Sequence, residues 1–328
     1  MTMNRVTPKG PPRQLLDAIR DRERFVLSSH ARPDGDSIGS QLALALALRE
    51  LGNTVRIVNR DPVPPFLASL PGASGIEVAD AVTDSFDAAV VLECSSLSRT
   101  EVGGLARHFV VNIDHHAGNE MYGAVNWFDE SAAACAEMVY DLVTGLGVTV
   151  TPLVGTCLYV GILTDTGSFR HANITARTFD LCRHVAATGV DVASVAASVY
   201  QQSSVGKLKL IGRLLESMQV QGGGRVATLY VDDDILESTD CAVDDMEGVI
   251  NMPLAARNIQ AVIFLKTLSD TTRVSLRSKG QIDVRAVAAS FGGGGHQNAS
   301  GFTLSGSRDN VQSRVLAMVV SALDAVHH

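Results

Sequence analysis

The sequence has few basic residues for a protein of its length. Its 328 residues include 27 Lys and Arg against 35 Asp and Glu, which gives a formal net charge of −8. Proteins that coat long nucleic acid normally carry a basic surface, so we do not expect long nucleic acid as a partner. The low hydrophobicity that marks disordered chains is absent too, because apolar residues make up 46% of the sequence.

Cysteines and long apolar runs are also scarce. The five cysteines form no C-x-x-C pair, and this odd number without close spacing favours reduced thiols over a disulfide framework. No apolar signal segment follows the polar first residues, and the stretch Leu42–Leu48 is too short to span a bilayer. We therefore expect a cytoplasmic protein without a membrane segment. The P-loop pattern G-x-x-x-x-G-K-[ST] is absent, which argues against a P-loop NTPase.

The first part of the chain alternates short apolar runs with helical segments. This order predicts a parallel α/β sheet. The predicted strands are Phe25–Ser29, Thr54–Asn59, Ala88–Glu93 and Phe109–Asp114, and the predicted helices are 14–23, Ser37–Gly52, 132–146, 152–163 and 174–188. Ligands of such sheets bind at the carboxyl ends of the strands, so we expect the site there.

The length of the chain exceeds the usual size of one hydrophobic core, which predicts a second domain. Residues 191–221 look mainly helical and end at the turn Gly222–Gly224. The elements predicted after them are the strand Arg225–Val231, a hairpin of Ala261–Leu268 and Thr272–Ser278 with the turn Ser269–Thr271, and the helices Asp283–Phe291 and 308–326. The predicted fold is therefore α/β: an N-terminal parallel-sheet domain (1–190), a helical connector (191–221) and a smaller α/β domain (222–328).

The loop after the first predicted strand carries His30, Asp34 and Asp36 within seven positions. A tight loop between a strand and a helix can aim all three side chains at one point, and Gly35 and Gly39 leave room for the backbone. One imidazole and two carboxylates suit a divalent ion such as Mn²⁺, Zn²⁺ or Fe²⁺ better than Ca²⁺. By themselves, these residues fit an Asp-Gly turn that caps a helix about equally well.

Two further predicted strands end in acidic residues. Glu93 closes an apolar strand, where an unpaired carboxylate would be costly, although an ordinary strand-end carboxylate is the alternative. Asp114, His115 and His116 follow the next strand. Neighbouring side chains point in different directions, so we expect one histidine to bind metal and the other to face the substrate. A structural histidine is the alternative for a lone His, and the run of three residues argues against it.

Asp165 follows a predicted helix and precedes a Gly-containing loop, where a helix N-cap is the alternative. With it, the sequence offers six candidate ligands, enough for two ions that share bridging carboxylates: His30, Asp34, Asp36, Glu93, His115 and Asp165. Two ions about 3.5–4 Å apart can activate a water molecule for an in-line phosphoryl displacement.

A run of four glycines, Gly292–Gly295, precedes His296 in the C-terminal part. Backbone N–H groups without side chains can cradle phosphate oxygens, and His296 can add a hydrogen bond. Arg277 and Lys279 are cations near the same place, although ordinary surface charge is the favoured interpretation of Lys279. A flexible hinge is the alternative for the glycines, but a predicted helix and strand bracket the run.

Four motifs in this order resemble the DHH phosphoesterase superfamily. They are HARPDGDSIGS (His30–Ser40), DHH (Asp114–His116), TDTGSF (Thr164–Phe169) and GGGGHQNASG (Gly292–Gly301). The last motif resembles the type 1 DHH-associated C-terminal domain. The resemblance covers nearly the whole chain, whose length is similar to that of the oligoribonuclease and pAp-phosphatase branch, the nano-RNases. It implies a DHH catalytic domain in 1–190 and a substrate-binding domain in 222–328.

The resemblance implies a metal role for each candidate ligand. His30 and Asp34 would bind one ion, and Asp36, His115 and Asp165 the other. Position 93 would bridge the two ions, which the resemblance predicts to be Mn²⁺. The family usually has Asp at this bridging position, whereas this chain has Glu93, whose side chain is one methylene longer.

The resemblance also implies the substrate contacts. His116 would face the scissile phosphate as an acid or electrostatic stabiliser, and Asp114 would orient the histidines. The nucleotide end would be held by residues of the C-terminal domain, namely Arg277, Ser278, Gly293, Gly294, Gly295 and His296.

We therefore predict a two-metal-dependent phosphodiesterase that degrades short oligoribonucleotides to nucleoside monophosphates and also dephosphorylates pAp. Hydrolysis of cyclic di-AMP or pApA is the nearest alternative, and a catalytically silent nucleotide sensor is the alternative of another class. A family II pyrophosphatase fits less well because of the GGGGH motif. A processive RecJ-type exonuclease fits less well because the chain has no extra nucleic-acid-binding domain. We expect no membrane partner, and a homodimer is the assembly we consider.

Overall fold

The computed structural model describes residues 10–241, 246, 248–268 and 271–326. The chain divides into two compact units, Met1–Gln202 and Ser203–His328. The segment predicted as a connector is therefore shared between them. Helix α6 (Val192–Tyr200) packs on the first core, whereas α7 (Val205–Glu216) buries Leu210 and Leu214 in the second unit.

The first unit contains a parallel sheet, as predicted, and the sheet has six strands, of which four were predicted. The strand order is β3-β2-β1-β4-β5-β6. The strands are β1 (Arg24–Ser28), β2 (Thr54–Asn59), β3 (Ile76–Val78), β4 (Ala88–Leu92), β5 (Phe109–Asp114) and β6 (Val125–Phe128). The sequence patterns missed only the edge strands β3 and β6, which are too short to show a clear period. Glu93, predicted as the last residue of a strand, lies just beyond β4 with a φ of 57°.

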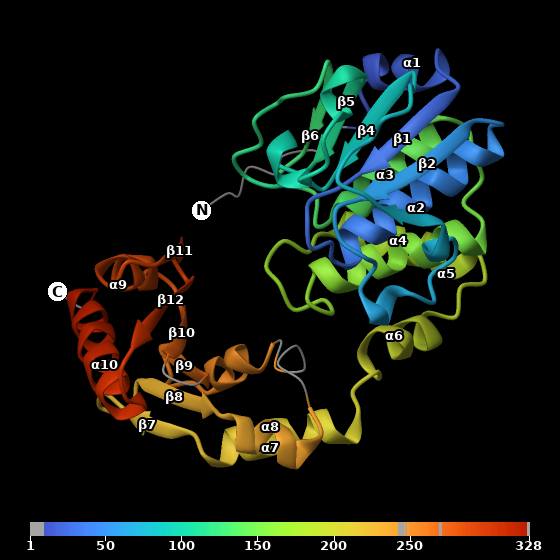
Figure 1. Ribbon diagram of the computed structural model, residues 1–328. Coiled ribbons are helices and arrows are strands. Elements are labelled where there is room, and N and C mark those ends of the chain that lie inside the picture. The colour runs from blue at the N-terminus through green and yellow to red at the C-terminus, as the bar shows by residue number, and fades with distance from the viewer. Residues whose placement is uncertain (1–9, 242–245, 247, 269–270, 327–328) are drawn as a thin grey trace, which may run out of the picture. The chain divides into compact units, whose positions relative to one another are not determined.

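Alternating side chains give this sheet two apolar faces. Helices pack on the face that carries Phe25 and Leu27, and a segment around Val82, Phe86 and Leu105 covers the face that carries Val26. The helices of this unit are α1 (Arg13–Arg20), α2 (Gly35–Glu50), α3 (Cys135–Gly145), α4 (Pro152–Asp165), α5 (Ala176–Ala187) and α6. Figure 1 shows α2, α3 and α4 side by side on one face of the sheet.

Two glycines let α2 and α4 pack closely. A Cβ atom on Gly39 would lie 2.4 Å from the carbonyl oxygen of Cys157, and one on Gly161 would lie 2.7 Å from Oδ1 of Asp36. Any side chain at either position would therefore push the helices apart. This close approach brings the first turn of α2 next to the last turn of α4, which ends at Asp165.

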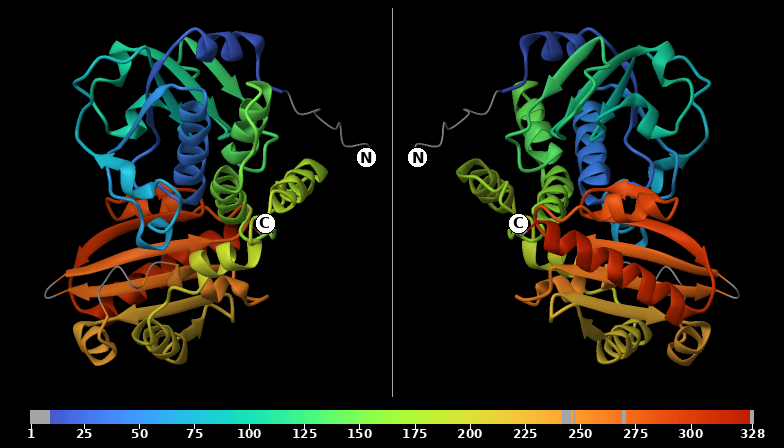
Figure 2. Two further views of the ribbon diagram at one scale, coloured as in Figure 1. Left: turned by 90° about the vertical axis from the view of Figure 1, so that its right-hand side faces the viewer. Right: turned by 90° about the vertical axis from the view of Figure 1, so that its left-hand side faces the viewer.

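The second unit is also α/β, with a mixed six-stranded sheet in the order β11-β12-β10-β9-β8-β7. Its strands are β7 (Gln219–Gln221), β8 (Val226–Val231), β9 (Ala261–Leu268), β10 (Thr271–Ser278), β11 (Gly294–His296) and β12 (Ala299–Ser305). Its α-helices are α7, α8 (Asp233–Thr239), α9 (Val284–Ser290) and α10 (Arg308–Ala325). One face of the sheet packs against α9 and α10, and Figure 2 shows α10 lying across it. The opposite face packs against α7 and α8 at β8 and β9.

The glycine turn Gly222–Gly224 has a different role from the one predicted. It does not end a helix but joins β7 to β8 as a hairpin, with φ values of 59°, 67° and 85°. Strand β7 was missed because its three residues are mostly exposed and carry little apolar pattern. Of the predicted turn 269–271, Thr271 begins β10, and residues 269–270 lie outside the described residues.

Short 3-10 helices complete both units: η1 (Pro65–Leu67), η2 (Ala73–Gly75), η3 (Leu97–Thr100), η4 (Leu105–Arg107) and η6 (Val249–Ala255). Within the described ranges, none of the helices combines the length and apolar character that crossing a membrane requires.

Candidate metal centre

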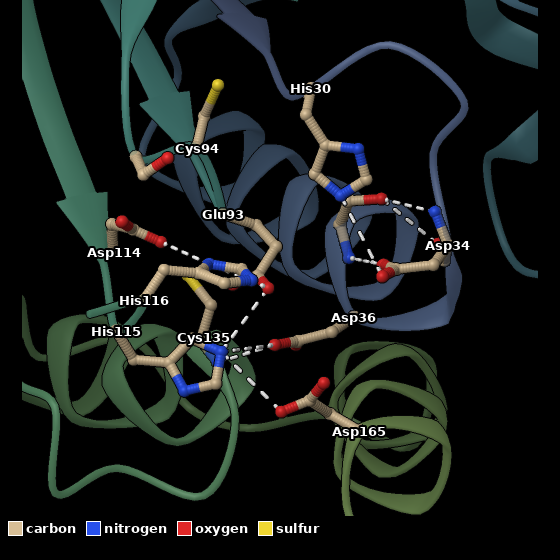
Figure 3. Close-up of polar contacts among 12 residues, drawn as sticks. His30, Asp34, Asp36, Glu93, Cys94, Asp114, His115, His116, Cys135 and Asp165 are labelled. Atoms are coloured by element: carbon tan, nitrogen blue, oxygen red, sulfur yellow. Dashed lines mark hydrogen bonds and ion pairs between the residues drawn. The ribbon is translucent and has the colours of Figure 1, made fainter. Parts of the chain in front are cut away.

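Four predicted ligands converge at the carboxyl edge of the first sheet. One ligand atom from each of Asp36, Glu93, His115 and Asp165 lies within 4.8 Å of the others. The Nε2 atom of His115 is 3.3 Å from Glu93 Oε1, 3.5 Å from Asp165 Oδ2 and 3.9 Å from Asp36 Oδ2. Figure 3 shows the three carboxylates pointing toward this one nitrogen.

Neighbouring strands bring Glu93 and His115 together. Strand β4 pairs with β5 in parallel, and the amide of Glu93 donates to the carbonyl oxygen of Ile113 over 3.0 Å. The two residues therefore leave the sheet side by side. The left-handed backbone of Glu93 is uncommon for a residue other than glycine, and such conformations cluster at functional sites.

Hydrogen bonds fix the ring orientation of two predicted histidine ligands. Nδ1–H of His115 donates to the carbonyl oxygen of Ala132 over 3.0 Å, and Nδ1–H of His30 donates to that of Ala31 over 2.8 Å. A neutral imidazole that donates through Nδ1 presents the lone pair of Nε2, which is the usual arrangement of metal-binding histidines. Nε2 of His30 lies 3.8 Å from Oδ2 of Asp34.

The buried carboxylates of the centre favour the binding of a cation. Glu93 is fully buried, and its Oε2 has no hydrogen-bond partner among the described residues. Burial raises the pKa of Glu93 well above its usual range, and burial together with the charge of Asp165 raises the pKa of Asp36 to about 6. Burial also raises the pKa of Asp165. Carboxylate oxygens and an imidazole nitrogen are the donors that divalent transition-metal ions accept, so these residues fit such ions.

The pKa of His115 reflects the same excess of negative charge in the centre. Burial alone would lower the pKa of His115, but the hydrogen bond and charge of Glu93, with the charges of Asp36 and Asp165, raise it to about 11. In the absence of an ion, a proton on His115 would balance part of the negative charge. A metal ion in the same place would neutralise the carboxylates and leave Nε2 free as a ligand.

Asp34 forms the helix cap that was one interpretation of its loop, while its role as a metal ligand stays a prediction. It is the N-cap of α2, where Oδ1 accepts the amide of Ser37 over 2.9 Å, while Oδ2 faces His30. Burial would raise the pKa of Asp34, but the nearby imidazole of His30 and the hydrogen bond from Ser37 outweigh it and lower the pKa to about 2. Gly35–Gly39 also spells G-x-S-x-G, but Ser37 is buried within this cap, which argues against a serine nucleophile.

His116 lies beside the four-residue cluster and could share an ion with Glu93 and His115, but its hydrogen bond is to Asp114. Its Nδ1–H donates to Asp114 Oδ1 over 2.9 Å and lies 3.4 Å from Glu93 Oε1. Asp114 is fully buried, and its Oδ2 accepts Nδ2–H of Asn119 over 2.6 Å. Burial would raise the pKa of Asp114, but the hydrogen bonds from His116 and Asn119 lower it. The sequence patterns did not single out Asn119, although it closes the run Ile113–Asn119 that contains the two histidines.

The predicted substrate residues of the second unit lie at one end of its sheet. Arg277 pairs with Ala299, which in turn pairs with His296 on β11. Directly opposed residues of antiparallel strands share a face, so Arg277 and His296 point to the same side of the sheet. Burial lowers the pKa of Arg277, which has no acidic partner among the described residues.

The other predicted substrate residues have internal contacts. The hydroxyl of Ser278 donates to the carbonyl oxygen of Ile282 over 2.7 Å and accepts Nδ2–H of Asn298 over 2.9 Å. Gly294 and Gly295 belong to β11, and a Cβ on Gly293 would lie 2.3 Å from the carbonyl oxygen of Gly301. The glycine run is thus an edge strand packed on β12 rather than a flexible hinge.

Known proteins share both units. Residues 24–162 match the model of the DHH family, N-terminal domain, and residues 210–324 match the DHHA1 domain. The chain is 35% identical over 295 residues to the bifunctional oligoribonuclease and PAP phosphatase NrnA of Thermus thermophilus, covering 89% of this chain and 88% of that protein. The NrnA of Bacillus subtilis is 26% identical over 300 residues, with 89% and 92% covered.

Solved structures with a similar fold also cover most of this chain. An exopolyphosphatase-related protein from Bacteroides fragilis superposes with a TM-score of 0.84 at 25% identity and covers 95% of this chain and 96% of that one. RecJ of Thermus thermophilus in complex with Mn²⁺ gives 0.51 at 13% identity, covering 95% of this chain and 54% of RecJ, which shows a shared fold alone. The chain belongs to the DHH family of phosphoesterases, with a DHH domain followed by a DHHA1 domain.

Proposed function

We propose that this protein is a two-metal-dependent phosphodiesterase that degrades short oligoribonucleotides to nucleoside monophosphates, and that it also dephosphorylates pAp to AMP. The observation that carries the proposal is the convergence of Asp36, Glu93 and Asp165 on Nε2 of His115, with Oε2 of Glu93 buried and unpartnered. The names of the NrnA relatives, which align over about nine-tenths of the chain, support this pair of substrates.

In this proposal each ligand has a defined partner. Asp36, His115 and Asp165 would hold one ion, His30 and Asp34 the other, and Glu93 both. We propose Mn²⁺ because a mixed set of carboxylates and imidazoles suits it. When bound, the two ions would supply positive charge to the phosphate oxygens and lower the pKa of a water molecule.

His116 is the proposed acid. Its Nδ1–H is held by Asp114, which is fixed in turn by Asn119, so the ring has one preferred orientation. With Nδ1–H bonded to Asp114, the doubly protonated ring would carry a second proton on Nε2, and His116 would give that proton to the leaving oxygen and become neutral. Asp114 therefore acts by positioning the ring, and this agrees with the division of labour expected between the two histidines.

We assign the grip on the nucleotide to the face that carries Arg277 and His296, with Gly293–Gly295 beside them. A guanidinium without an acidic partner is suited to bind a phosphate through paired hydrogen bonds. Ser278 contributes indirectly, because its hydroxyl is already engaged within the unit. The acidic balance of the chain favours substrates of a few nucleotides over long nucleic acid. We place the activity in the cytoplasm, and a homodimer remains our expectation.

A substrate panel tests the proposal. The purified protein with Mn²⁺ is given pAp, RNA of two to five nucleotides, a 24-nucleotide RNA, pApA and cyclic di-AMP, and products are separated by chromatography. We expect turnover of pAp and of the short RNAs, little cleavage of the long RNA, and none in EDTA. Faster turnover of cyclic di-AMP or pApA than of the short RNAs would identify the protein as a cyclic di-AMP or pApA phosphodiesterase instead. Binding without any turnover would identify a sensor instead.

A further inference from the structure

The loop from β6 to α3 supplies backbone groups to two of the ligands. The carbonyl oxygen of Ala132 accepts Nδ1–H of His115, and the amides of Cys135 and Ala136 donate to the carboxylate of Asp36 over 2.5 Å and 3.0 Å. A shift of this loop would therefore turn the His115 ring and move Asp36 together. The orientation of His115 and the position of Asp36 therefore depend on how rigidly residues 129–136 are fixed.

An arginine on helix α5 forms an ion pair with this loop. Arg177, on α5, places Nη1 3.3 Å from Asp129 Oδ2 and 3.6 Å from Glu137 Oε2, and Nη2 2.5 Å from Asp141 Oδ2. Asp129 lies at the start of the loop, where its Oδ1 accepts the amide of Ser131 over 3.1 Å. The arginine thus ties α5 both to the beginning of the loop and to helix α3.

Glu137 connects the arginine to the middle of the loop. Its Oε2 accepts the amide of Ala133 over 3.3 Å. Asn173 secures the same residue from the other side, because its Nδ2–H donates to the carbonyl oxygen of Ala133 over 2.8 Å. The loop between Asp129 and Glu137 is therefore fixed at both ends and at its centre.

Most of this charge network is buried, and among the described residues Arg177 is the cation that pairs with its carboxylates. The side chains of Glu137, Asp129 and Arg177 are 0%, 6% and 16% exposed. Oε1 of Glu137 has no hydrogen-bond partner among the described residues. Removing the guanidinium would leave buried carboxylates without a counter-charge, so they would draw in water or move apart.

We propose that Arg177 is a positioning residue of the metal centre. It neutralises Asp129, Glu137 and Asp141 and thereby fixes the loop whose carbonyl and amide groups orient His115 and Asp36. This inference rests on the proposed metal site, but not on the identity of the substrate. Outer groups that hold metal ligands typically change metal affinity or activity about 10–100-fold when they are removed.

Metal binding separates this role from a purely structural one. Mn²⁺ affinity is measured by calorimetry on metal-free Arg177→Gln, with Arg183→Gln as the matched control. Arg183 lies on the same helix, but its side chain is 64% exposed, and its side-chain contacts in the described part of the chain are with the exposed groups Asp180 and His184. We expect Arg177→Gln to bind Mn²⁺ about 10–100-fold more weakly, Arg183→Gln to bind like the natural protein, and saturating Mn²⁺ to restore most of the turnover of Arg177→Gln. An affinity of Arg177→Gln within twofold of the natural value would overturn the proposal.

A second variant covers the case in which Arg177→Gln does not fold. Asn173→Ala removes the bond to Ala133 without leaving a buried charge, and it should weaken Mn²⁺ binding several-fold while the protein stays folded in circular dichroism. Unchanged Mn²⁺ binding by folded Asn173→Ala would then count against the loop as the element that orients the ligands. Both measurements are made without substrate. Intact Mn²⁺ binding by the natural protein without turnover would reject the proposed function and leave this inference standing.

Discussion

The carboxylate of Asp36 accepts the backbone amide of Cys135 at 2.5 Å, across 99 positions of the sequence. Cys135 begins α3, and the N-cap residue Ala134 has no polar side chain that could accept a backbone N–H of this helix. Asp36 on α2 therefore caps a second helix while it also faces His115. One carboxylate thus joins the helical layer of the first unit to its metal centre.

This double role predicts the behaviour of Asp36→Asn. The amide side chain can still accept one backbone hydrogen bond, and it removes a negative charge that lies close to Asp165 and Glu93. We expect the metal-free variant to unfold at a temperature equal to or above that of the natural protein. Added Mn²⁺ should raise the unfolding temperature of the natural protein but not that of the variant, because only the former binds the ions tightly. A clear Mn²⁺-induced rise in Asp36→Asn, measured by scanning calorimetry, would remove Asp36 from the ligand set.

Glu93 stands where the resemblance to the DHH superfamily implies Asp. Glu93→Gln and Glu93→Ala should each reduce Mn²⁺-dependent turnover by about 10²-fold or more, since the shared carboxylate of the centre is lost. Glu93→Asp keeps the charge and restores the usual residue of the family, so we expect its turnover within about tenfold of the natural value. Initial rates with pAp at several Mn²⁺ concentrations measure these changes. Full activity of Glu93→Ala would place Glu93 outside the centre.

Asn119 is expected to act through Asp114 on His116. Asn119→Ala removes the 2.6 Å hydrogen bond to Asp114 and frees the ring of His116. We predict a fall in kcat of about 10-fold with little change in KM or in Mn²⁺ affinity. The matched control is Asn126→Ala, which removes another member of the same amide network without touching Asp114. Equal effects of the two variants would show that Asn119 serves the fold only.

Arg277 and Ser278 are neighbours with different expected roles. Arg277→Ala should raise KM for pAp about 10-fold or more, because a charge-assisted phosphate contact is lost. Ser278→Ala should leave KM unchanged and lower the free energy of unfolding by about 1 kcal/mol, because two internal hydrogen bonds lose their hydroxyl. Steady-state kinetics and urea unfolding distinguish the two effects. A large KM change in Ser278→Ala with unchanged stability would reverse the assignment.

The pair Arg56–Glu77 at the edge of the first sheet gives a pH prediction. Hydrogen bonds from Arg56 lower the pKa of Glu77 below its ordinary value of 4.5. A lowered folded pKa means that the pair stabilises the fold above pH 4.5 and that this stabilisation disappears as the pH falls through the folded pKa. The side chains are well exposed, so the contribution is below about 1 kcal/mol. The free energies of unfolding of the natural protein and Glu77→Gln, measured in urea, should therefore differ at pH 6 and converge as the pH falls through the folded pKa of Glu77.

The sequence alone determined the local parts of this protein. Strands β2, β5 and β9 begin and end where their apolar patterns predict. The candidate ligands of the first loop and the Asp-His-His run stand close together in the chain, so residue type and spacing made them candidates, and the family resemblance implied their metal roles. Their positions at strand ends also predicted one common edge of the sheet, because parallel strands end on the same side.

Only the tertiary structure decided which groups hold the ligands in place. The bond from Cys135 to Asp36 and the contacts of Arg177 join residues that are far apart in sequence, and no local period records them. The same holds for β11, whose three residues form a strand only because β12 lies beside them. The local sequence determines which residues can donate to a metal ion and which segments can form helices and strands. The orientation of a buried donor depends on long-range packing and charge balance, which exist only once the chain has folded.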